Sequence, residues 1–208
     1  MKLKTVLITC GVCLLPMLLG ILTYNQLPNQ IPIHWNIAGE IDGYASKAIF
    51  VFLLPVLMCG IQLLSLFMMS ADPKYKNYSA KMARIVIWII PFITIILEFI
   101  TYAIVFGYNI SVNIVIPMCI GVLFIVLGNY LPKCRQNFTL GYRLPWTLND
   151  EDNWNKSNRL AGYIMVIGGF LVIILSIFDL AFWAILGFIP VFLLVPAVYS
   201  FLLYHKKL

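Results

Sequence analysis

Charged residues are scarce in this sequence. Asp, Glu, Lys and Arg make up only 11% of its 208 residues, whereas soluble domains contain about 25%. Hydrophobic residues make up 62% of the chain instead. This composition excludes a sizeable soluble domain and predicts an all-α, polytopic membrane protein located in the cell membrane.

Motifs for catalysis and cofactor binding are also missing. The sequence contains no glycine-rich phosphate-binding loop, no nucleophile elbow and no HExxH motif. None of its five cysteines falls in a loop that we expect to face outward, so we expect no structural disulfide. They are Cys10, Cys13, Cys59, Cys119 and Cys134. We therefore expect no enzyme, no metal site and no cofactor.

Long apolar runs dominate what is present. The runs span residues 5–24, 48–70, 85–106, 114–131 and 160–204. A helix that crosses a bilayer needs about 20 apolar residues. The last run, at ~1.5 Å per residue, is about twice that length, so we divide it into two helices with a turn near residues 179–183. The sequence thus predicts six transmembrane helices.

The basic residues are distributed unevenly between the two sides of these six helices. Every Lys and Arg except Lys47 falls on the side that holds both termini. Cytoplasmic loops of membrane proteins carry an excess of Lys and Arg. The pattern predicts that both termini, the 71–84 loop and the 132–159 segment are cytoplasmic, and that the 25–47 loop faces outward. It also accounts for the net charge of +6 without direct nucleic-acid binding.

Three side chains of the outward loop could suggest a metal site: His34, Glu40 and Asp42. Their spacing matches no common zinc pattern, and no Cys or second His lies nearby. We therefore interpret residues 25–47 as a structured loop.

One carboxylate, Glu98, lies deep inside a predicted span. A charge near the bilayer centre costs at least ~2.5 kcal/mol, so this side chain is expected to face the helix bundle, where it can be protonated at neutral pH. Two interpretations remain open: a proton- or ligand-binding site, and a hydrogen-bonded contact between helices. No second intramembrane acid or base accompanies Glu98, which argues against a proton relay.

The polar segment, residues 132–159, cannot cross the membrane. Within it, Pro145 biases the preceding residue toward an extended backbone, and Asn149 could cap a helix whose first turn holds three acids. The basic residues near enough in sequence to neutralise those acids are Arg143, Lys156 and Arg159. Two interpretations are consistent with this pattern. One is a docking surface for a partner; the other is an interfacial helix with Trp at headgroup depth and Arg on lipid phosphate.

Two stretches resemble known families. The first runs from Leu27-Pro28 through Pro32-Ile33-His34-Trp35-Asn36 to Gly39, Asp42-Gly43 and Ser46-Lys47, and it resembles a DUF1648-type domain, a domain of unknown function of bacterial membrane proteins. The second runs from Gly128-Asn129 through Asn137, Gly141-Tyr142-Arg143, Pro145-Trp146-Thr147-Leu148, Trp154 and Asn158-Arg159 to Gly162, and it is similar to the signature of the SdpI family. The chain departs from that signature at Leu144, where the family usually has Thr, and at Ser157-Asn158, where Thr-His is common.

The resemblance implies two membrane domains, residues 1–70 of the DUF1648 type and residues 71–208 of the SdpI type. It implies an integral membrane immunity protein that gives resistance to a secreted antimicrobial peptide toxin. It also implies a signalling role, in which a cytoplasmic transcriptional repressor is held at the membrane. Besides these partners, the spans would contact membrane lipid.

The resemblance also implies which residues meet these partners. The toxin-facing residues of the outer loop would be His34, Trp35, Asn36 and Asp42. The residues of the cytoplasmic segment that meet a partner would be Gly141, Arg143, Pro145, Trp146, Trp154 and Arg159. An alternative from a different class is a small membrane transporter or membrane enzyme that uses Glu98, His34 and Asp42.

Overall fold

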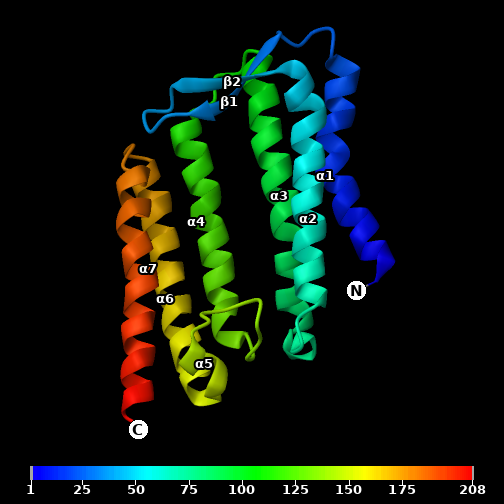
Figure 1. The fold of residues 1–208 in the computed structure, drawn as a ribbon. Coiled ribbons are helices and arrows are strands. Elements are labelled where there is room, and N and C mark those ends of the chain that lie inside the picture. The colour runs from blue at the N-terminus through cyan, green and yellow to red at the C-terminus, as the bar shows by residue number, and fades with distance from the viewer. Residues whose placement is uncertain (1, 208) are drawn as a thin grey trace. The chain divides into compact units, whose positions relative to one another are not determined.

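Six long helices form most of the protein (Figure 1). The computed structural model describes residues 2–207, and six of its helices are long and apolar enough to cross a membrane. They are α1 (Leu3–Thr23), α2 (Leu54–Ser70, preceded by a π-helical turn Ile49–Leu53), α3 (Ala80–Val105), α4 (Val112–Tyr130), α6 (Glu151–Ser176) and α7 (Ala181–His205). This confirms the predicted all-α, six-helix membrane architecture.

Two of the helices begin earlier than hydrophobicity alone predicts. Helix α3 begins at Ala80 rather than at residue 85, and α6 begins at Glu151 rather than at residue 160. An apolar run marks only the part of a helix that suits the bilayer core, whereas a well-capped helix continues into water. The polar residues 151–159 are therefore the first turns of a membrane-spanning helix and not a separate interfacial helix.

The described chain folds into two units. Unit 1 joins the chain up to Ser70 with Arg84–Val112, and unit 2 joins Ala71–Ala83 with the chain from Asn113 onward. Each unit has its own buried cluster of apolar side chains, and each is described separately below.

In unit 1, helices α1, α2 and α3 pack around an apolar cluster. Its buried members are Leu27, Ile31, Phe50, Val51 and Tyr102. Helix α1 approaches closely at Gly20, where an added Cβ would lie 2.4 Å from the Tyr102 hydroxyl oxygen. The Tyr102 hydroxyl donates a hydrogen bond to the carbonyl oxygen of Pro16 at 3.1 Å, which ties α3 to α1.

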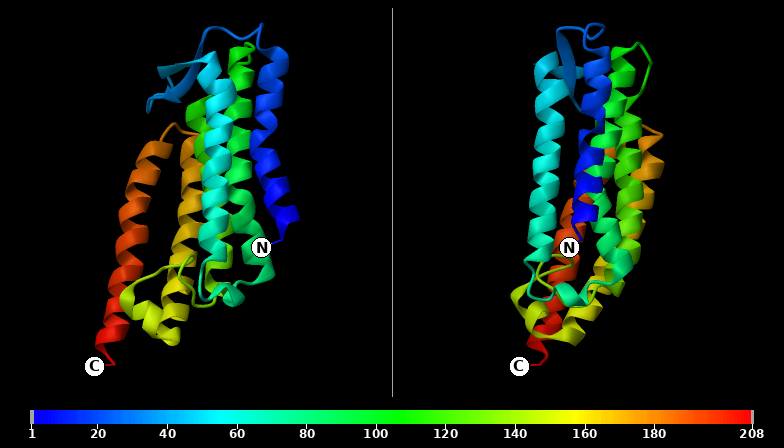
Figure 2. Two further views of the ribbon diagram at one scale, coloured as in Figure 1. Left: turned by 45° about the vertical axis from the view of Figure 1, so that its right-hand side comes forward. Right: turned by 90° about the vertical axis from the view of Figure 1, so that its right-hand side faces the viewer.

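A β-hairpin connects α1 to α2 (Figure 2). Strand β1 (Gln30–Trp35) pairs antiparallel with β2 (Ile41–Ser46), and the register shifts on both sides of His34. Gly43 lies opposite His34, and a Cβ there would come within 2.8 Å of the His34 Cβ. The sequence predicted a structured loop in this region but not the strands.

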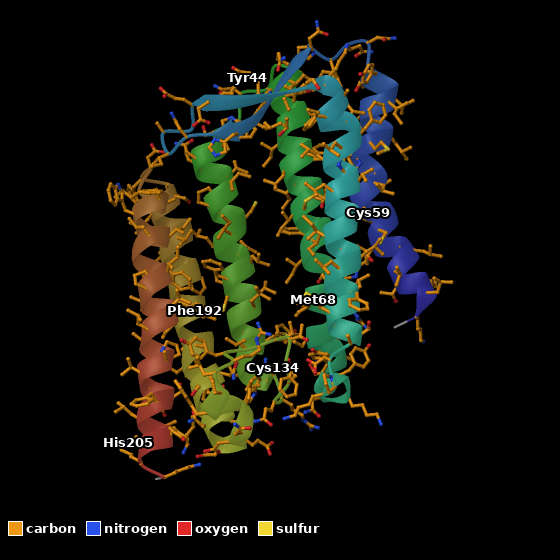
Figure 3. All side chains as sticks on the ribbon, viewed as in Figure 1. Tyr44, Cys59, Met68, Cys134, Phe192 and His205 are labelled. Carbon is orange, nitrogen blue, oxygen red and sulfur yellow. The ribbon has the colours of Figure 1, made fainter. Side chains whose placement is uncertain are left out.

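In unit 2, helices α4 and α6 approach closely through two pairs of glycines. An added Cβ would lie 2.7 Å from the Gly162 carbonyl oxygen if placed on Gly128, and 2.7 Å from the Gly169 carbonyl oxygen if placed on Gly121. Small residues at such crossings let the backbones of membrane helices pack against each other. Helix α7 completes unit 2, with Phe192 packed on the apolar cluster between α4 and α6 (Figure 3).

Candidate functional site

The segment between α4 and α6 is built around Asn137, which is fully buried. Its side-chain oxygen accepts hydrogen bonds from the backbone N–H groups of Thr139 and Leu140 at 2.9 and 2.6 Å. Its amide nitrogen donates to the Arg135 carbonyl oxygen at 2.8 Å. Asparagine is favoured where a side chain must replace the hydrogen bonds of a regular backbone, and here one Asn fixes the whole turn.

A second anchor of this segment is Trp154, in the first turns of α6. Its side chain has 0% exposure, and its indole Nε1 donates a hydrogen bond to the carbonyl oxygen of Cys134 at 2.7 Å. Gly141 has φ +109°, and a Cβ there would lie 2.8 Å from the Trp154 ring. Asn158, one turn further along α6, accepts a hydrogen bond from the Tyr142 N–H at 2.7 Å. Two residues of the predicted partner surface, Gly141 and Trp154, thus contact each other inside unit 2.

Asp72, which we did not single out from the sequence, ties the α2–α3 loop to the same segment. It is 6% exposed and accepts four hydrogen bonds. The donors are the Tyr78 hydroxyl at 2.5 Å, the Thr139 hydroxyl at 2.8 Å, the Phe138 N–H at 2.9 Å and the Lys74 N–H at 2.8 Å. We call this group the Asp72 clasp.

The Asp72 clasp favours the ionised carboxylate. Burial by itself raises the pKa of Asp72, but the hydrogen bonds of the clasp outweigh burial and hold the pKa below its ordinary value. Two further contacts reinforce the clasp, from the Lys74 ammonium to the Gln136 side-chain oxygen and from the Asn77 amide to the Gln136 carbonyl oxygen, both 2.6 Å. The only signal of this site in the sequence is the Asp72-Pro73 turn after a span, and it does not reveal the partner.

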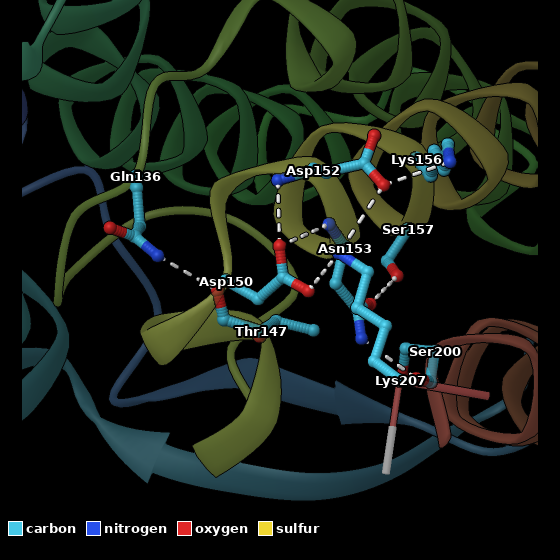
Figure 4. Close-up of polar contacts among 9 residues, drawn as sticks. All are labelled: Gln136, Thr147, Asp150, Asp152, Asn153, Lys156, Ser157, Ser200 and Lys207. Atoms are coloured by element: carbon cyan, nitrogen blue, oxygen red, sulfur yellow. Dashed lines mark hydrogen bonds and ion pairs between the residues drawn. The ribbon is translucent and has the colours of Figure 1, made fainter. Parts of the chain in front are cut away.

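The short helix α5 (Pro145–Asn149) leads into α6 through an acidic cap (Figure 4). The predicted cap, Asn149, is wrong: Asp150 is the N-cap, and its carboxylate accepts from the N–H groups of Asp152 and Asn153 at 3.0 and 3.2 Å. Asn149 instead donates its side-chain amide to the Pro145 carbonyl oxygen. Aspartate suits the position because it accepts these N–H groups and its charge complements the helix N-terminus.

The positive partners of these acids are partly different from those predicted. Lys156 pairs with Asp152 at 2.8 Å, as expected. Asp150, however, pairs with Lys207 in the C-terminal tail at 2.5 Å, and this hydrogen bond is the main reason why the pKa of Asp150 is lowered. Arg143 donates instead to the Phe138 carbonyl oxygen.

Helix α7 is joined to this cap by Ser200, a buried residue. Its carbonyl oxygen accepts from the Asn153 side-chain amide at 2.8 Å (Figure 4). Its hydroxyl oxygen accepts from the Trp146 indole N–H at 2.9 Å. Ser157 donates its hydroxyl hydrogen to Asn153, which completes the set. Trp146 is therefore half-buried against α7 and ties α5 to it.

Much of the family signature thus lies inside unit 2, and only part of the predicted partner surface is exposed. Arg143, Pro145 and Arg159 are exposed, Trp146 is half-buried, and Trp154 is buried. A partner at this surface would meet the exposed basic groups and the outer side of α5, while the internal asparagines and Trp154 hold these in place.

The hairpin of unit 1 carries the second set of predicted residues. His34 Nδ1 lies 2.5 Å from the Asp42 carboxylate, and this pair faces solvent. Asn36 has a turn-forming role: its side-chain oxygen accepts from the Ala38 and Glu40 N–H groups at 2.9 and 3.0 Å. Trp35 is half-buried.

The hairpin that carries the His34–Asp42 pair also exposes apolar side chains, and these were not singled out from the sequence. They are Ile33, Ile37, Ile41 and Tyr44. Among residues 2–207 no group of three or more His, Cys, Asp or Glu side chains is arranged to hold a metal ion. The hairpin therefore exposes apolar groups together with a carboxylate and an imidazole. Glu98 lies elsewhere, buried on α3.

Comparison with known proteins covers both regions. The family model described as "Domain of unknown function (DUF1648)" matches residues 11–59, which include the hairpin. The model described as "SdpI/YfhL protein family" matches residues 133–203, from the polar segment to α7. The chain is also similar to "Immunity protein SdpI" of Bacillus subtilis (strain 168), with 30% identity over 211 residues that cover 99% of this chain and 97% of the relative. No solved structure matches the chain.

Proposed function

The chain belongs to the SdpI family, and we propose that it protects its cell by binding a secreted antimicrobial peptide without chemistry. It is a multi-pass protein of the cell membrane. The observation that supports the proposal most strongly is the similarity to an immunity protein along 99% of the chain. That similarity includes both the hairpin and the polar segment, so neither candidate surface is an addition peculiar to this chain.

The orientation that we propose follows from charge. All Lys and Arg residues but Lys47 fall on the side of both termini, which supports cytoplasmic termini and an outward-facing hairpin. In this orientation the hairpin is the part of the protein that a peptide arriving from outside meets first.

The hairpin has the chemistry to bind a membrane-active peptide. Such a peptide needs apolar side chains to enter a bilayer, and the hairpin exposes Ile37 at 65% and Tyr44 at 58%. Exposed apolar groups in a folded protein commonly mark a surface that contacts a partner. The adjacent Asp42 carboxylate and His34 imidazole can accept or donate hydrogen bonds to peptide backbone or to a basic side chain.

The experiment is expression of the protein in a sensitive Gram-positive host, followed by challenge with a panel of secreted peptides. The expected result is that survival rises for at least one peptide relative to cells carrying the empty vector, at a confirmed level of protein in the membrane. Unchanged survival against the whole panel, with the protein present in the membrane, would contradict the proposal.

A second function, capture of a cytoplasmic DNA-binding regulator, is supported by the polar segment. The Asp72 clasp and the Asp150 cap hold this segment in one conformation, and Arg143 and Arg159 are exposed on it. A rigid surface with exposed guanidinium groups suits acidic side chains of a protein partner. The test is whether a fluorescently tagged candidate DNA-binding regulator, co-expressed with this chain, moves to the membrane on toxin exposure. A regulator that stays in the cytoplasm while cells survive would leave immunity as the sole function.

The structure favours these roles over a transporter or enzyme that uses Glu98, His34 and Asp42. His34 and Asp42 pair with each other at the hairpin surface, whereas Glu98 is buried among the helices of unit 1. The relative is an immunity protein and not a member of an enzyme family.

A further inference from the structure

The carboxyl group of Glu98 is buried in the apolar interior of unit 1. The residue is 5% exposed, and neither of its oxygens has a hydrogen-bond partner among residues 2–207. Buried polar groups in folded proteins are nearly always hydrogen-bonded. Because its oxygens accept no hydrogen bond from the described part of the chain, Glu98 does not act in this structure as a hydrogen-bonded link between helices. Such a link was one of the two interpretations of the sequence.

The hydroxyl groups nearest to Glu98 along α3 donate their hydrogens elsewhere. Thr94 donates to the Ile90 carbonyl oxygen at 2.8 Å, and Thr101 donates to the Leu97 carbonyl oxygen at 3.0 Å. Tyr102, one turn after Glu98, donates to Pro16 on α1. Since each hydroxyl has one hydrogen to donate, none of these three is left to stabilise a carboxylate anion.

The titratable groups around Glu98 are also uncharged or acidic. From α1, Cys13 faces this region and contacts Thr94 at 3.9 Å. On α2 the titratable side chain is Cys59. On α3 itself the titratable neighbour is Tyr102. Thiols and a phenol cannot supply the positive charge that an ionised Glu98 would require.

The Lys and Arg residues of unit 1 lie at the ends of its helices. Among the described residues of unit 1 they are Lys2, Lys4, Lys47 and Arg84, and the histidine of this unit, His34, lies on the hairpin. Arg84 precedes Glu98 by about 21 Å of helix at ~1.5 Å per residue. On the same basis, Lys4 precedes Cys13, which faces the Glu98 region, by about 14 Å. Lys47 lies over the ring of Tyr24. An ionised Glu98 would thus be a buried charge without a counter-ion.

We propose that Glu98 is a proton-binding site in the interior of unit 1, occupied at neutral pH, so that the resting protein carries a neutral carboxylic acid there. A carboxyl group without donors or a counter-ion in an apolar interior takes up a proton instead of remaining charged. The ligand is a proton, and a proton needs no cavity, so it can bind to a carboxyl group that is enclosed by protein. Release of the proton would place a charge among α1, α2 and α3 and so loosen their packing.

The proposal is independent of the immunity function, and infrared spectroscopy of the purified protein in detergent tests it. Seven of the eight acidic residues lie in loops, in the hairpin or at helix ends, so at neutral pH Glu98 should be the main source of a protonated carboxyl C=O band. We expect this band in the wild type, its loss in Glu98→Gln, and its retention in Glu151→Gln, a control at an exposed acid. A folded wild type without the band at neutral pH, or with the band unchanged in Glu98→Gln, would overturn the proposal.

Thermal unfolding at several pH values provides a second test. If Glu98 acted only through packing, Glu98→Gln would not change how the unfolding midpoint depends on pH. Glutamine mimics the neutral acid in size and cannot ionise. As pH rises from mildly acidic values, the unfolding midpoint of the wild type should fall relative to that of Glu98→Gln, because the unfolded wild type releases the Glu98 proton at a lower pH than the folded protein does. Parallel pH profiles would contradict the proposal. If Glu98→Gln does not fold, loss of the C=O band on raising the pH of the wild type decides the same question.

Discussion

The Tyr78 hydroxyl donates a hydrogen bond of 2.5 Å to the carboxylate of Asp72. Through the same carboxylate, the loop between α2 and α3 is joined to Phe138 and Thr139, 66 and 67 residues further along the chain. Burial and the hydrogen bond to Asp72 together raise the pKa of the Tyr78 hydroxyl, so it remains a donor throughout the physiological range.

Replacement of Asp72 by Asn is expected to destabilise unit 2. An amide presents one oxygen and one donor group, so some of the four donors around Asp72 would lose their acceptor. Leaving buried polar groups unsatisfied typically costs about 1–3 kcal/mol. The measurement is the unfolding midpoint in detergent, with Asp152→Asn as a control because Asp152 is exposed and joined only to surface lysines. Equal effects of the two substitutions would contradict the structural role of the clasp.

The contribution of Asp72 should also depend on pH. Its pKa is lower in the folded protein than its ordinary value, because the clasp favours the ionised form. This stabilisation is therefore fully present above the unfolded-state pKa and is lost as pH falls through the folded-state pKa. The difference in unfolding midpoint between wild type and Asp72→Asn should shrink in acid. A difference that stays constant or grows in acid would show that the carboxylate is not the stabilising species.

The glycine crossing of α4 and α6 gives a prediction that requires no knowledge of function. A Cβ on Gly128 would lie 2.7 Å from the Gly162 carbonyl oxygen, and backbone at that distance has to move. We expect Gly128→Ala to destabilise the protein by about 1–3 kcal/mol, the usual cost of overpacking. Gly187→Ala is the matched control, since nothing lies within 4 Å of a Cβ at that helical position. Similar unfolding midpoints for the two variants would contradict the close crossing.

The six membrane helices could be predicted from the sequence because a span must be both apolar and about 20 residues long. The hairpin could not, because its register shifts on both sides of His34 and so interrupts the simple alternation of a strand. The polar segment was recognised from its signature, but its internal bonds were not. Asp72 and Lys207 reach it from residues 66 and 57 positions away, and nothing local in the sequence reveals such partners. The family resemblance assigned Trp154 to a partner surface, whereas its indole is buried against Cys134.

The proposed orientation can be measured by cysteine labelling in intact cells. In a background without the five native cysteines, an impermeant maleimide added outside should label Ile37→Cys on the hairpin and should not label Asn149→Cys at the end of α5. Both side chains are exposed, so accessibility within the folded protein does not limit the reaction. Permeabilised cells provide the control, in which Asn149→Cys should react. The reverse pattern in intact cells would place the hairpin in the cytoplasm and the polar segment outside, and would contradict the proposed orientation.

The exposed Arg143 separates signalling from protection. Arg143→Lys keeps the charge but loses the planar, two-pronged donor geometry that matches a carboxylate. We expect it to reduce membrane recruitment of a tagged regulator while leaving survival under peptide challenge unchanged. Lys156→Arg is the control, because it preserves both the charge and the pairing with Asp152. Equal loss of recruitment in both variants would indicate nonspecific charge attraction between the regulator and this protein, or misfolding of the variants, instead of a specific contact at Arg143.

The most direct test of the account is survival under peptide challenge for variants of the hairpin surface, at matched amounts of protein in the membrane. His34→Ala and Tyr44→Ser remove a polar and an apolar group from that surface, and binding hot spots of this kind typically contribute at least ~2 kcal/mol. Ile61→Ala is the control, an exposed apolar residue on α2 outside the hairpin. We predict that protection falls strongly in the two hairpin variants and is retained in Ile61→Ala. Full protection by both hairpin variants, together with loss of protection in Arg143→Lys, would contradict binding of the toxin at the hairpin.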